Sequence, residues 1–279
     1  MTIDWLETPQ ILEPHVLQRH GCPIHYWTGG PAGRPAVVFL HGATMDHRMF
    51  NAQVPVVAQS YRVLVWDARG QGRSQPIGDA FTLQECADDL LAVLDQENQP
   101  DAIFVGQSLG GYIAQFAYLA QPGRVRALAV IGTTCIALPY TRAEVWTLKA
   151  TLPLFNLWPY GHLRSTIATN TALRPDVIAY AQKAVDQIAR RDFLTIWKAV
   201  SLAVDEKGIP GHHIKVPFLL THGDQDKTGS IRKQAPEWAA YEPDCRYRVI
   251  PDAGHNANQD NPAAFNAVLL DFLAETEAS

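Results

Sequence analysis

The sequence predicts an α/β protein: a mostly parallel sheet, flanked by helices, that is interrupted by an α-helical insertion. Short apolar runs rich in strand-forming residues alternate with segments of helical periodicity. The apolar runs are almost continuous, which is typical of strands covered on both faces. The alternation stops for about 75 residues in the second half of the chain and then resumes. Strands separated by helices favour parallel pairing with right-handed crossovers.

The elements before the insertion can be assigned in order. Alternating runs at residues 16–19 and 24–27 flank Gly21-Cys22-Pro23 and predict an antiparallel hairpin. The next apolar runs predict strands at residues 36–40, 62–66, 102–105 and 125–131. A helix is expected at residues 83–96, because Thr82 and Glu85 can form a capping box at its start.

The insertion spans residues 138–213, where helix-like stretches occur at residues 144–151, 176–190 and 193–204. Beyond it, strands are predicted at residues 216–221 and 246–250, with a helix at residues 231–240 between them. The last helix should begin at Asn261-Pro262, a capping residue followed by proline. We therefore expect a core domain of residues 1–137 and 214–279, and a helical domain of residues 138–213.

Composition and charge exclude several classes of protein. The net charge is −5 and no long basic run occurs, which argues against nucleic-acid binding. No apolar stretch reaches the roughly 18 residues of a membrane span, and the first residues do not resemble a signal peptide. The four cysteines contain no C-x-x-C pair and are expected to be reduced thiols in a cytoplasmic protein: Cys22, Cys86, Cys135 and Cys245.

The pentapeptide Gly106-Gln107-Ser108-Leu109-Gly110 stands between a predicted strand and an apolar helix. A G-x-S-x-G match alone is common, but strand, tight turn and helix in this order are the context of a nucleophile elbow. The strained turn exposes a serine hydroxyl at a helix N-terminus, where N–H groups can meet developing negative charge. Ser108 is therefore the candidate nucleophile. The pattern suggests no function for Gln107.

A serine hydroxyl needs a base to remove its proton, and the base needs an anion behind it. His255 is the candidate base, because it lies just after the last strand and before the last helix. The loop after the preceding strand offers two candidate anions. Asp226 is preferred, since it lies further along that loop, and Asp224 is the alternative, with a turn-stabilising function otherwise expected for it.

Two backbone N–H groups are expected to form an oxyanion hole. One belongs to Leu109, the residue after the nucleophile. The second belongs to the loop after the first long strand, where Ala43 is the preferred donor and Thr44 the fallback. His41 in the same loop is expected to make a structural hydrogen bond.

On these residues, the chain resembles the α/β-hydrolase superfamily. The resemblance includes the order Ser108, Asp226, His255, the His41-Gly42 loop, and a D-x-R-G-x-G-x-S segment at residues 67–74. That segment usually has histidine where this chain has Gln71. The family implies a mostly parallel eight-stranded sheet with a helical cap over the site, and residues 138–213 fit the cap.

The implied activity is that of an esterase-like serine hydrolase acting on a small carboxylic ester, thioester or lactone through an acyl-enzyme. No cofactor is expected, and no metal, since the adjacent His212 and His213 should point in different directions. Arg190-Arg191 is interpreted as a solvated helix face rather than an anion clamp. The oligomeric state is left open, and the tryptophans of the insertion are not assigned as pocket residues.

Three alternatives remain. Cofactor-free haloperoxidases and perhydrolases share the serine triad, and so do carbon–carbon bond hydrolases. A receptor-like protein that keeps the triad but turns over little substrate belongs to a different class. Serine at the elbow weighs against haloalkane dehalogenases and epoxide hydrolases, which have aspartate there.

Overall fold

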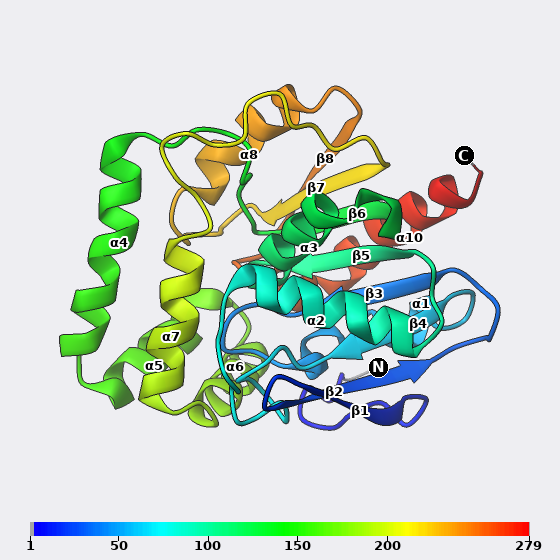
Figure 1. Cartoon of the computed structure of the whole chain (residues 1–279), viewed down its shortest axis with the longest axis horizontal. Coiled ribbons are helices and arrows are strands. Elements are labelled where there is room, and N and C mark those ends of the chain that lie inside the picture. Colours follow the sequence, from blue (N-terminus) through cyan, green and yellow to red (C-terminus); the bar gives the residue numbers. More distant parts are fainter. Residues whose placement is uncertain (1–2, 279) are drawn as a thin grey trace.

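Within residues 3–278, which the computed structural model describes, the strands form one eight-stranded sheet in the order β1-β2-β4-β3-β5-β6-β7-β8 (Figure 1). The strands are β1 (Glu13–Arg19), β2 (Cys22–Gly29), β3 (Ala36–Leu40), β4 (Arg62–Trp66), β5 (Ala102–Gln107), β6 (Val125–Ile131), β7 (Phe218–Gly223) and β8 (Cys245–Ile250). Only β2 runs against its neighbours, β1 and β4, and the other pairs are parallel. The predicted fold class is therefore confirmed.

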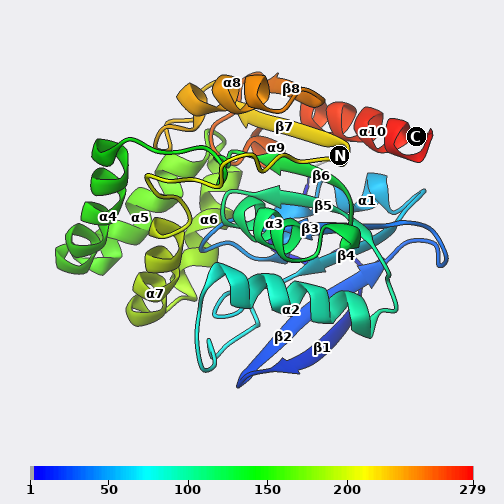
Figure 2. The same cartoon turned by 45° about the horizontal axis from the view of Figure 1, so that its top comes forward.

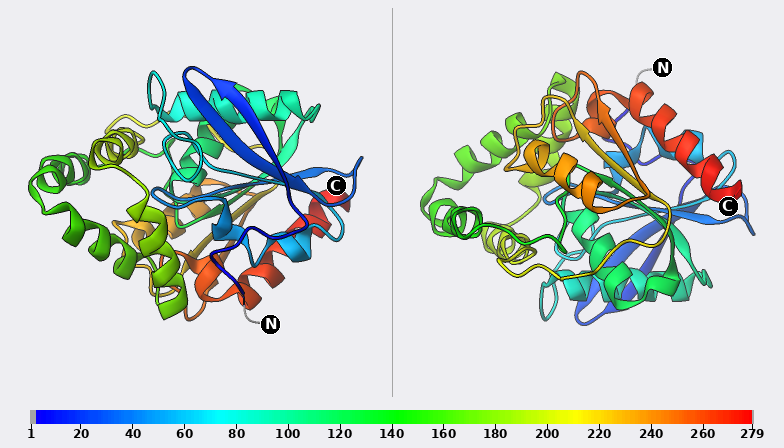
Figure 3. Two further views of the ribbon diagram at one scale, coloured as in Figure 1. Left: turned by 90° about the horizontal axis from the view of Figure 1, so that it is seen from below. Right: turned by 90° about the horizontal axis from the view of Figure 1, so that it is seen from above.

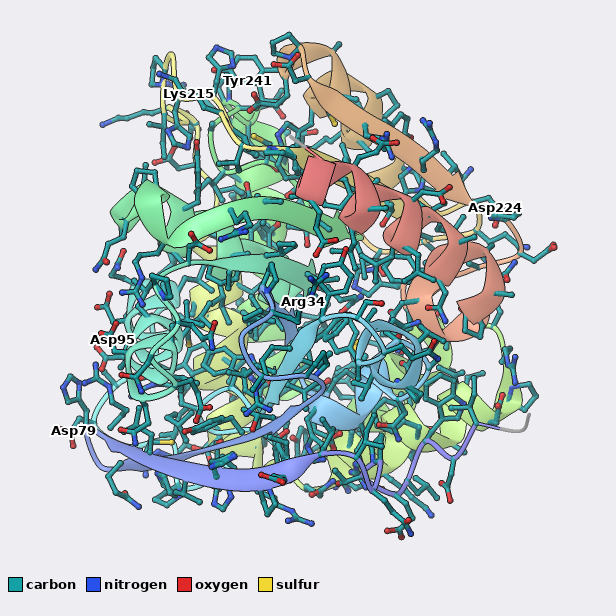
Figure 4. The ribbon with its side chains drawn as sticks, turned by 90° about the vertical axis from the view of Figure 1, so that its right-hand side faces the viewer. Arg34, Asp79, Asp95, Lys215, Asp224 and Tyr241 are labelled. Atoms are coloured by element: carbon teal, nitrogen blue, oxygen red, sulfur yellow. The ribbon has the colours of Figure 1, made fainter. Side chains whose placement is uncertain are left out.

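The parallel strands direct their carboxyl ends toward one edge of the sheet, where the loops after β3, β5, β7 and β8 lie. In open α/β sheets this is the edge at which ligands bind. Figure 4 looks at the opposite end of the molecule, with Arg34, just before β3, near its centre.

Helices cover both faces of the sheet (Figure 3). The core on one face includes residues of α2 (Leu83–Gln96), α3 (Leu109–Ala120) and α8 (Ile231–Tyr241); the other includes residues of α1 (Val54–Val57) and α10 (Pro262–Ala278). Successive residues of β3 enter the two cores in turn: Val38 and Leu40 belong to the first, Val37 and Phe39 to the second. This two-sided burial explains the continuous apolar runs in the sequence.

Four helices stand between β6 and β7, and we call them the helical insertion: α4 (Arg142–Leu157), α5 (Tyr160–Thr171), α6 (Pro175–Asp186) and α7 (Arg190–Ser201). They lie beyond the carboxyl ends of the parallel strands, at the left in Figures 1 and 2. The insertion is thus next to the edge of the sheet at which ligands bind in folds of this class.

Several predicted boundaries were wrong. The helix expected at residues 176–190 ends at Asp186, and the helix expected at residues 193–204 begins earlier, at Arg190, directly after the extended backbone of Ala189. Strand β7 begins at Phe218 rather than residue 216, since Pro217 has no N–H for the ladder. Helix α5 was not predicted. The start of α10 at Pro262 is confirmed, and the Asn261 side chain accepts the Ala264 N–H at 3.2 Å.

The capping box predicted at Thr82 is only half formed. The Thr82 hydroxyl accepts the Glu85 N–H at 3.0 Å, but the Glu85 carboxylate contacts His20 and Arg69 instead of the Thr82 backbone. A complete capping box forms at the start of α4, between Thr141 and Glu144. The Glu85 carboxylate is thus engaged by tertiary partners.

Two findings concern the membrane spans and the disulfide bonds that were considered from the composition. No helix within residues 3–278 combines the length and apolar character needed to cross a bilayer. The four cysteines are free thiols, and Cys22, Cys86 and Cys135 are buried.

Candidate active site

Ser108 is the single residue between β5 and α3, and its backbone is strained. Its φ is 50° and its ψ is −113°, a conformation that costs a non-glycine residue about 1–3 kcal/mol. The Ser108 N–H donates to the Ile131 carbonyl at 2.9 Å, and the Thr133 hydroxyl donates to the Ser108 carbonyl at 2.8 Å. These bonds to the end of β6 hold the turn, so the serine stands at the carboxyl edge of the sheet.

The glycines on either side of Ser108 are required by close packing. A Cβ at Gly106 would lie 2.5 Å from the Gly110 carbonyl oxygen, and a Cβ at Gly110 would collide with the Leu40 carbonyl. The first glycine therefore lets the turn close, and the second lets α3 approach β3. This is the packing that the G-x-S-x-G pattern predicts.

The structure brings His255 and Asp226 together. The His255 Nδ1 atom lies 2.9 Å from Asp226 Oδ2, and the other carboxylate oxygen accepts the Thr228 N–H at 2.8 Å. Burial acts to raise the pKa of the Asp226 carboxyl, but the His255 charge and hydrogen bond, with Thr228, outweigh it and lower that pKa below its ordinary value. An ionised Asp226 keeps the proton on Nδ1 and leaves Nε2 free to accept one.

Ser108 and His255 are not joined by a hydrogen bond in the part of the chain that the structure describes. Catalytic hydrogen bonds are often long or poorly aligned before substrate binds and tighten in the complex. The elbow and the histidine are connected instead through the neighbouring residue, Gln107.

Gln107, for which the sequence suggested no function, joins three loops. Its side-chain amide donates to the His255 carbonyl at 3.1 Å and is almost fully buried. Its Oε1 atom lies against the Gly42 backbone so closely that a Cβ on Gly42 would collide with it. Gln107 thus fixes the loop that carries His255 relative to the elbow and to the loop after β3.

Gly132 lies against the His255–Asp226 pair and was also missed. Its φ is +56°, and a Cβ there would lie 3.0 Å from His255 Nδ1 and 3.3 Å from Asp226 Oδ2. Its N–H donates to the Thr221 carbonyl at 2.8 Å. A glycine one residue after a strand carries no sequence signal for this packing, since it depends on two distant loops.

Replacing Gly132 with alanine is expected to lower the free energy of unfolding by at least about 1–2 kcal/mol, the cost of a left-handed backbone for a residue with Cβ. Urea denaturation of wild type and variant measures this difference. Gly123→Ala is the matched control, because no heavy atom lies within 4 Å of its Cβ position. Equal losses in the two variants would contradict the account of Gly132.

The loop of residues 41–45 contains both N–H groups considered for the second oxyanion donor, those of Ala43 and Thr44. The Ala43 and Leu109 N–H groups have no hydrogen-bond partner among residues 3–278, whereas the Thr44 N–H donates to Gln71 Oε1 at 2.6 Å. The Thr44 hydroxyl donates to the Ala43 carbonyl at 2.6 Å. Thr44, the fallback donor, is therefore already engaged.

Gln71 stands where the resemblance leads one to expect histidine, and it holds this loop. It is fully buried, and Thr44, its partner, has a φ of +66°, which is unusual for a β-branched residue. The Met45 N–H donates to the Gly42 carbonyl at 3.2 Å and closes a turn around Ala43 and Thr44. Gln71 thus stabilises a strained turn next to Ser108.

His41 and Asp224 make structural contacts. Nδ1 of His41 donates to the Gly42 carbonyl at 2.8 Å, and Nε2 accepts the Ala68 N–H at 2.9 Å. Burial lowers the pKa of His41, so it is neutral. Asp224 accepts the Ala253 N–H at 3.0 Å and thereby holds the turn before His255.

Other polar clusters have partners within the protein. Atoms of Asp46, His47 and Asp67 that could bind a metal lie within 4.8 Å of one another. However, Asp67 Oδ1 accepts the backbone N–H of His47 and lies against its ring Nδ1, each at 2.8 Å, and Asp46 pairs with Arg48. The His213 ring stacks on Tyr241 at 4.3 Å. The cluster of three therefore stabilises the loops after β3 and β4.

The two arginines at the start of α7 differ: Arg191 is exposed, as expected, whereas Arg190 is half-buried. Its guanidinium donates to the Asn156 carbonyl and, at 3.2 Å, to the Trp158 carbonyl, where α4 ends. A cation at a helix C-terminus is favourable. Arg190 thus ties α7 to α4.

Known proteins share this architecture. The family described as alpha/beta hydrolase fold matches residues 35–262. The 3-oxoadipate enol-lactonase 1 of Acinetobacter baylyi is 26% identical over 92% of this chain and 96% of its own. A non-heme haloperoxidase of Rhodococcus erythropolis is also 26% identical, over 93% and 99%.

Among solved structures, the enol-lactonase of Burkholderia xenovorans LB400 superposes with a TM-score of 0.80 at 24% identity and covers 93% of this chain and 100% of its own. The family and the name of the Acinetobacter baylyi relative support hydrolase activity. The chain belongs to the alpha/beta hydrolase fold family.

Proposed function

We propose that the protein is a serine hydrolase that cleaves carboxylic esters, including lactones and thioesters, through an acyl-enzyme on Ser108. One observation carries the proposal: a strained Ser108 stands between β5 and α3, at the edge of the sheet where Asp226 and His255 form a buried 2.9 Å pair. The lactonase relative supports the same bond type, since a lactone is a cyclic ester.

In this mechanism His255 removes the proton of the Ser108 hydroxyl as its oxygen attacks the ester carbonyl. Asp226 keeps the imidazole in the tautomer that accepts this proton and stabilises the imidazolium that forms. The imidazolium then protonates the leaving alcohol, and the carbonyl re-forms as an acyl-enzyme. Water, activated by His255, attacks the acyl group, releases the acid and restores the serine.

The Ala43 and Leu109 N–H groups would stabilise the oxyanion of each tetrahedral intermediate. Their freedom from other hydrogen bonds within the described residues supports this function. Leu109 is also the first residue of α3, so the helix dipole favours negative charge at this point. Removal of one such donor typically lowers kcat by about 10²–10³-fold.

We further propose that residues 138–213 act as a cap that selects the substrate, over a core of residues 1–137 and 214–279. The position of the helical insertion beyond the carboxyl edge supports this division (Figures 1 and 2). Its tryptophans have different environments. Trp197 of α7 donates to the Thr151 hydroxyl at 2.7 Å and packs against Phe155 of α4, while Trp146 is 72% exposed.

Gln71→Leu tests the turn around Ala43. The variant loses the acceptor of the Thr44 N–H, so the strained turn relaxes and the Ala43 donor moves. We expect kcat to fall by about 10–100-fold, which is no larger than the fall in kcat expected when one oxyanion donor is removed. KM should change little. Gln84→Leu, an exposed glutamine on α2, is the control. An unchanged kcat in Gln71→Leu would refute this function of Gln71.

The proposed function is tested with a panel of aryl and alkyl esters, thioesters and lactones of graded acyl length. The assay contains neither peroxide nor halide, so turnover reports hydrolysis alone. We expect release of the acid, with a burst of alcohol where deacylation is slow. Activity only with added peroxide would favour a perhydrolase, and binding without turnover would favour a receptor-like protein; either result would overturn the proposal.

A further inference from the structure

Asp260 is a buried carboxylate that bonds to two separate parts of the chain. It is the last residue of α9 (Ala257–Asp260) and only 6% exposed. Oδ2 accepts the Gly254 N–H at 2.8 Å. Oδ1 accepts the N–H groups of Leu173 at 3.0 Å and Arg174 at 3.1 Å.

The two sets of donors belong to the candidate site and to the helical insertion. Gly254 immediately precedes His255. Leu173 and Arg174 form the joint between α5 and α6, and Arg174 is the N-cap residue of α6. A carboxylate at a helix N-terminus is favourable because of the helix dipole. A single side chain therefore holds the insertion and the backbone of the proposed base.

A second bond joins the same two segments on the other side of His255. The Asn256 N–H donates to the Thr171 carbonyl at 2.7 Å. A Cβ at Gly254 would lie 3.1 Å from Asp260 Oδ2 and 3.5 Å from both Leu173 Cγ and the Thr171 carbonyl oxygen, so there is little space between the two segments at this point. Both neighbours of His255 are thus tied to the α5–α6 joint, directly or through Asp260.

The anion is held there at a cost. Burial raises the pKa of the Asp260 carboxyl above its ordinary value, although the Gly254, Arg174 and Leu173 hydrogen bonds act in the opposite direction. The Arg174 guanidinium, whose charge also acts to lower the pKa of Asp260, is paired with Asp176 at 2.7 Å. Burial of an ionisable group is unfavourable. Because the Asp260 carboxyl is buried and bonds to both segments, its side chain does more in this position than fill space.

We propose that Asp260 is a positioning residue that couples the helical insertion to His255, so that displacement of the α5–α6 joint displaces the imidazole. The consequence for catalysis rests on the proposed function, but the coupling itself does not. In an enzyme that must admit substrate past the insertion, this link would align the base only when the insertion is seated.

Amide hydrogen exchange tests the coupling without a substrate. In Asp260→Asn we expect exchange to accelerate together in residues 171–176 and 253–257, by about 10–100-fold, the effect of losing hydrogen bonds to a charged acceptor. Asp252→Asn is the matched control: an exposed aspartate of the same loop, with a φ of +52° that asparagine tolerates, should change neither segment. Acceleration in one segment alone, or in neither, would overturn the proposal.

A second variant acts from the insertion and avoids the buried charge. Tyr180 of α6 forms its hydrogen bonds with Asp46, at 3.2 Å, and with no residue of the His255 loop. Tyr180→Phe loosens α6 with little risk to folding. If Asp260 transmits displacement, exchange at residues 253–257 rises in Tyr180→Phe, and this rise is smaller when Asp260→Asn is already present, with the direct Asn256–Thr171 bond accounting for the remainder. An equal rise in both backgrounds would show that Asp260 transmits nothing.

Kinetics give a separate readout. We expect Asp260→Asn to lower kcat by about 10–100-fold with KM within a few fold, and Asp260→Glu, which keeps the charge, to recover part of the loss. If the wild type hydrolyses no ester, the proposed function fails. The hydrogen-exchange results still test whether Asp260 couples the insertion to the His255 loop. A fall in stability with unchanged kcat would reduce Asp260 to a structural residue.

Discussion

Replacing Ser108 with alanine is expected to lower kcat for ester hydrolysis by a factor on the order of 10⁴–10⁶, the range seen when a triad nucleophile is removed. The reason is that the covalent acyl-enzyme cannot form without the serine Oγ. Only the oxyanion donors and substrate binding then contribute to the remaining rate. Steady-state kinetics on the best ester of the panel, at saturating substrate, measure the loss. KM should change little, because the hydroxyl contributes little to ground-state binding.

The backbone of the variant supplies an internal check. Alanine keeps the strained φ of +50°, so Ser108→Ala should be about as stable as wild type, whereas Ser108→Gly should gain about 1 kcal/mol by removing the strain. Ser165→Ala, an exposed serine on α5, controls for the substitution. Comparable hydrolysis by wild type and Ser108→Ala would show that the activity does not depend on the elbow.

The second large effect is expected at Asp226. Asp226→Asn should lower kcat by about 10⁴-fold near neutral pH, because the amide no longer holds the Nδ1 proton of His255 and the wrong tautomer forms. Asp224→Asn is the matched comparison, since Asp224 lies two residues away and its side chain bonds to the turn at Ala253. We expect Asp224→Asn to stay within about tenfold of wild type. A larger loss at Asp224 than at Asp226 would reverse the assignment.

The lowered pKa of Asp226 adds a test by pH. A carboxyl whose pKa is lower in the folded than in the unfolded state stabilises the fold fully above its unfolded pKa, about 3.9. This contribution is lost as the pH falls through the folded pKa. The stability advantage of wild type over Asp226→Asn should therefore be constant at neutral pH and shrink below about pH 4. An advantage that grows with acidity would contradict the lowered pKa of Asp226.

The sequence predicted what depends on local pattern. The bounds of β3, β4, β6 and α2 follow from apolar runs and a capping residue, and the structure has them as expected. The order of Ser108, Asp226 and His255 follows from their places after predicted strands, and Asp226 and His255 do meet. Helix α5 was missed, because Tyr160–Thr171 is polar and has little amphipathic periodicity.

What the sequence could not predict depends on contacts between distant segments. Gly132 is needed because two loops approach it, and Gln107 acts on a carbonyl 148 positions away. Asp260 bonds to residues 86 and 87 positions away in the insertion. No local pattern distinguishes these from an ordinary turn glycine, a buried amide or a helix-end acid. They became visible only when the loops at the carboxyl edge were placed together.

Labelling with a fluorophosphonate, followed by peptide mass mapping, tests the central claim most directly, since the reagent reacts only with an activated nucleophile. We predict a single adduct, on the peptide that contains Ser108, and at least about 10³-fold slower labelling in His255→Ala. An adduct on any other residue, or labelling of Ser108 at the same rate without His255, would contradict it.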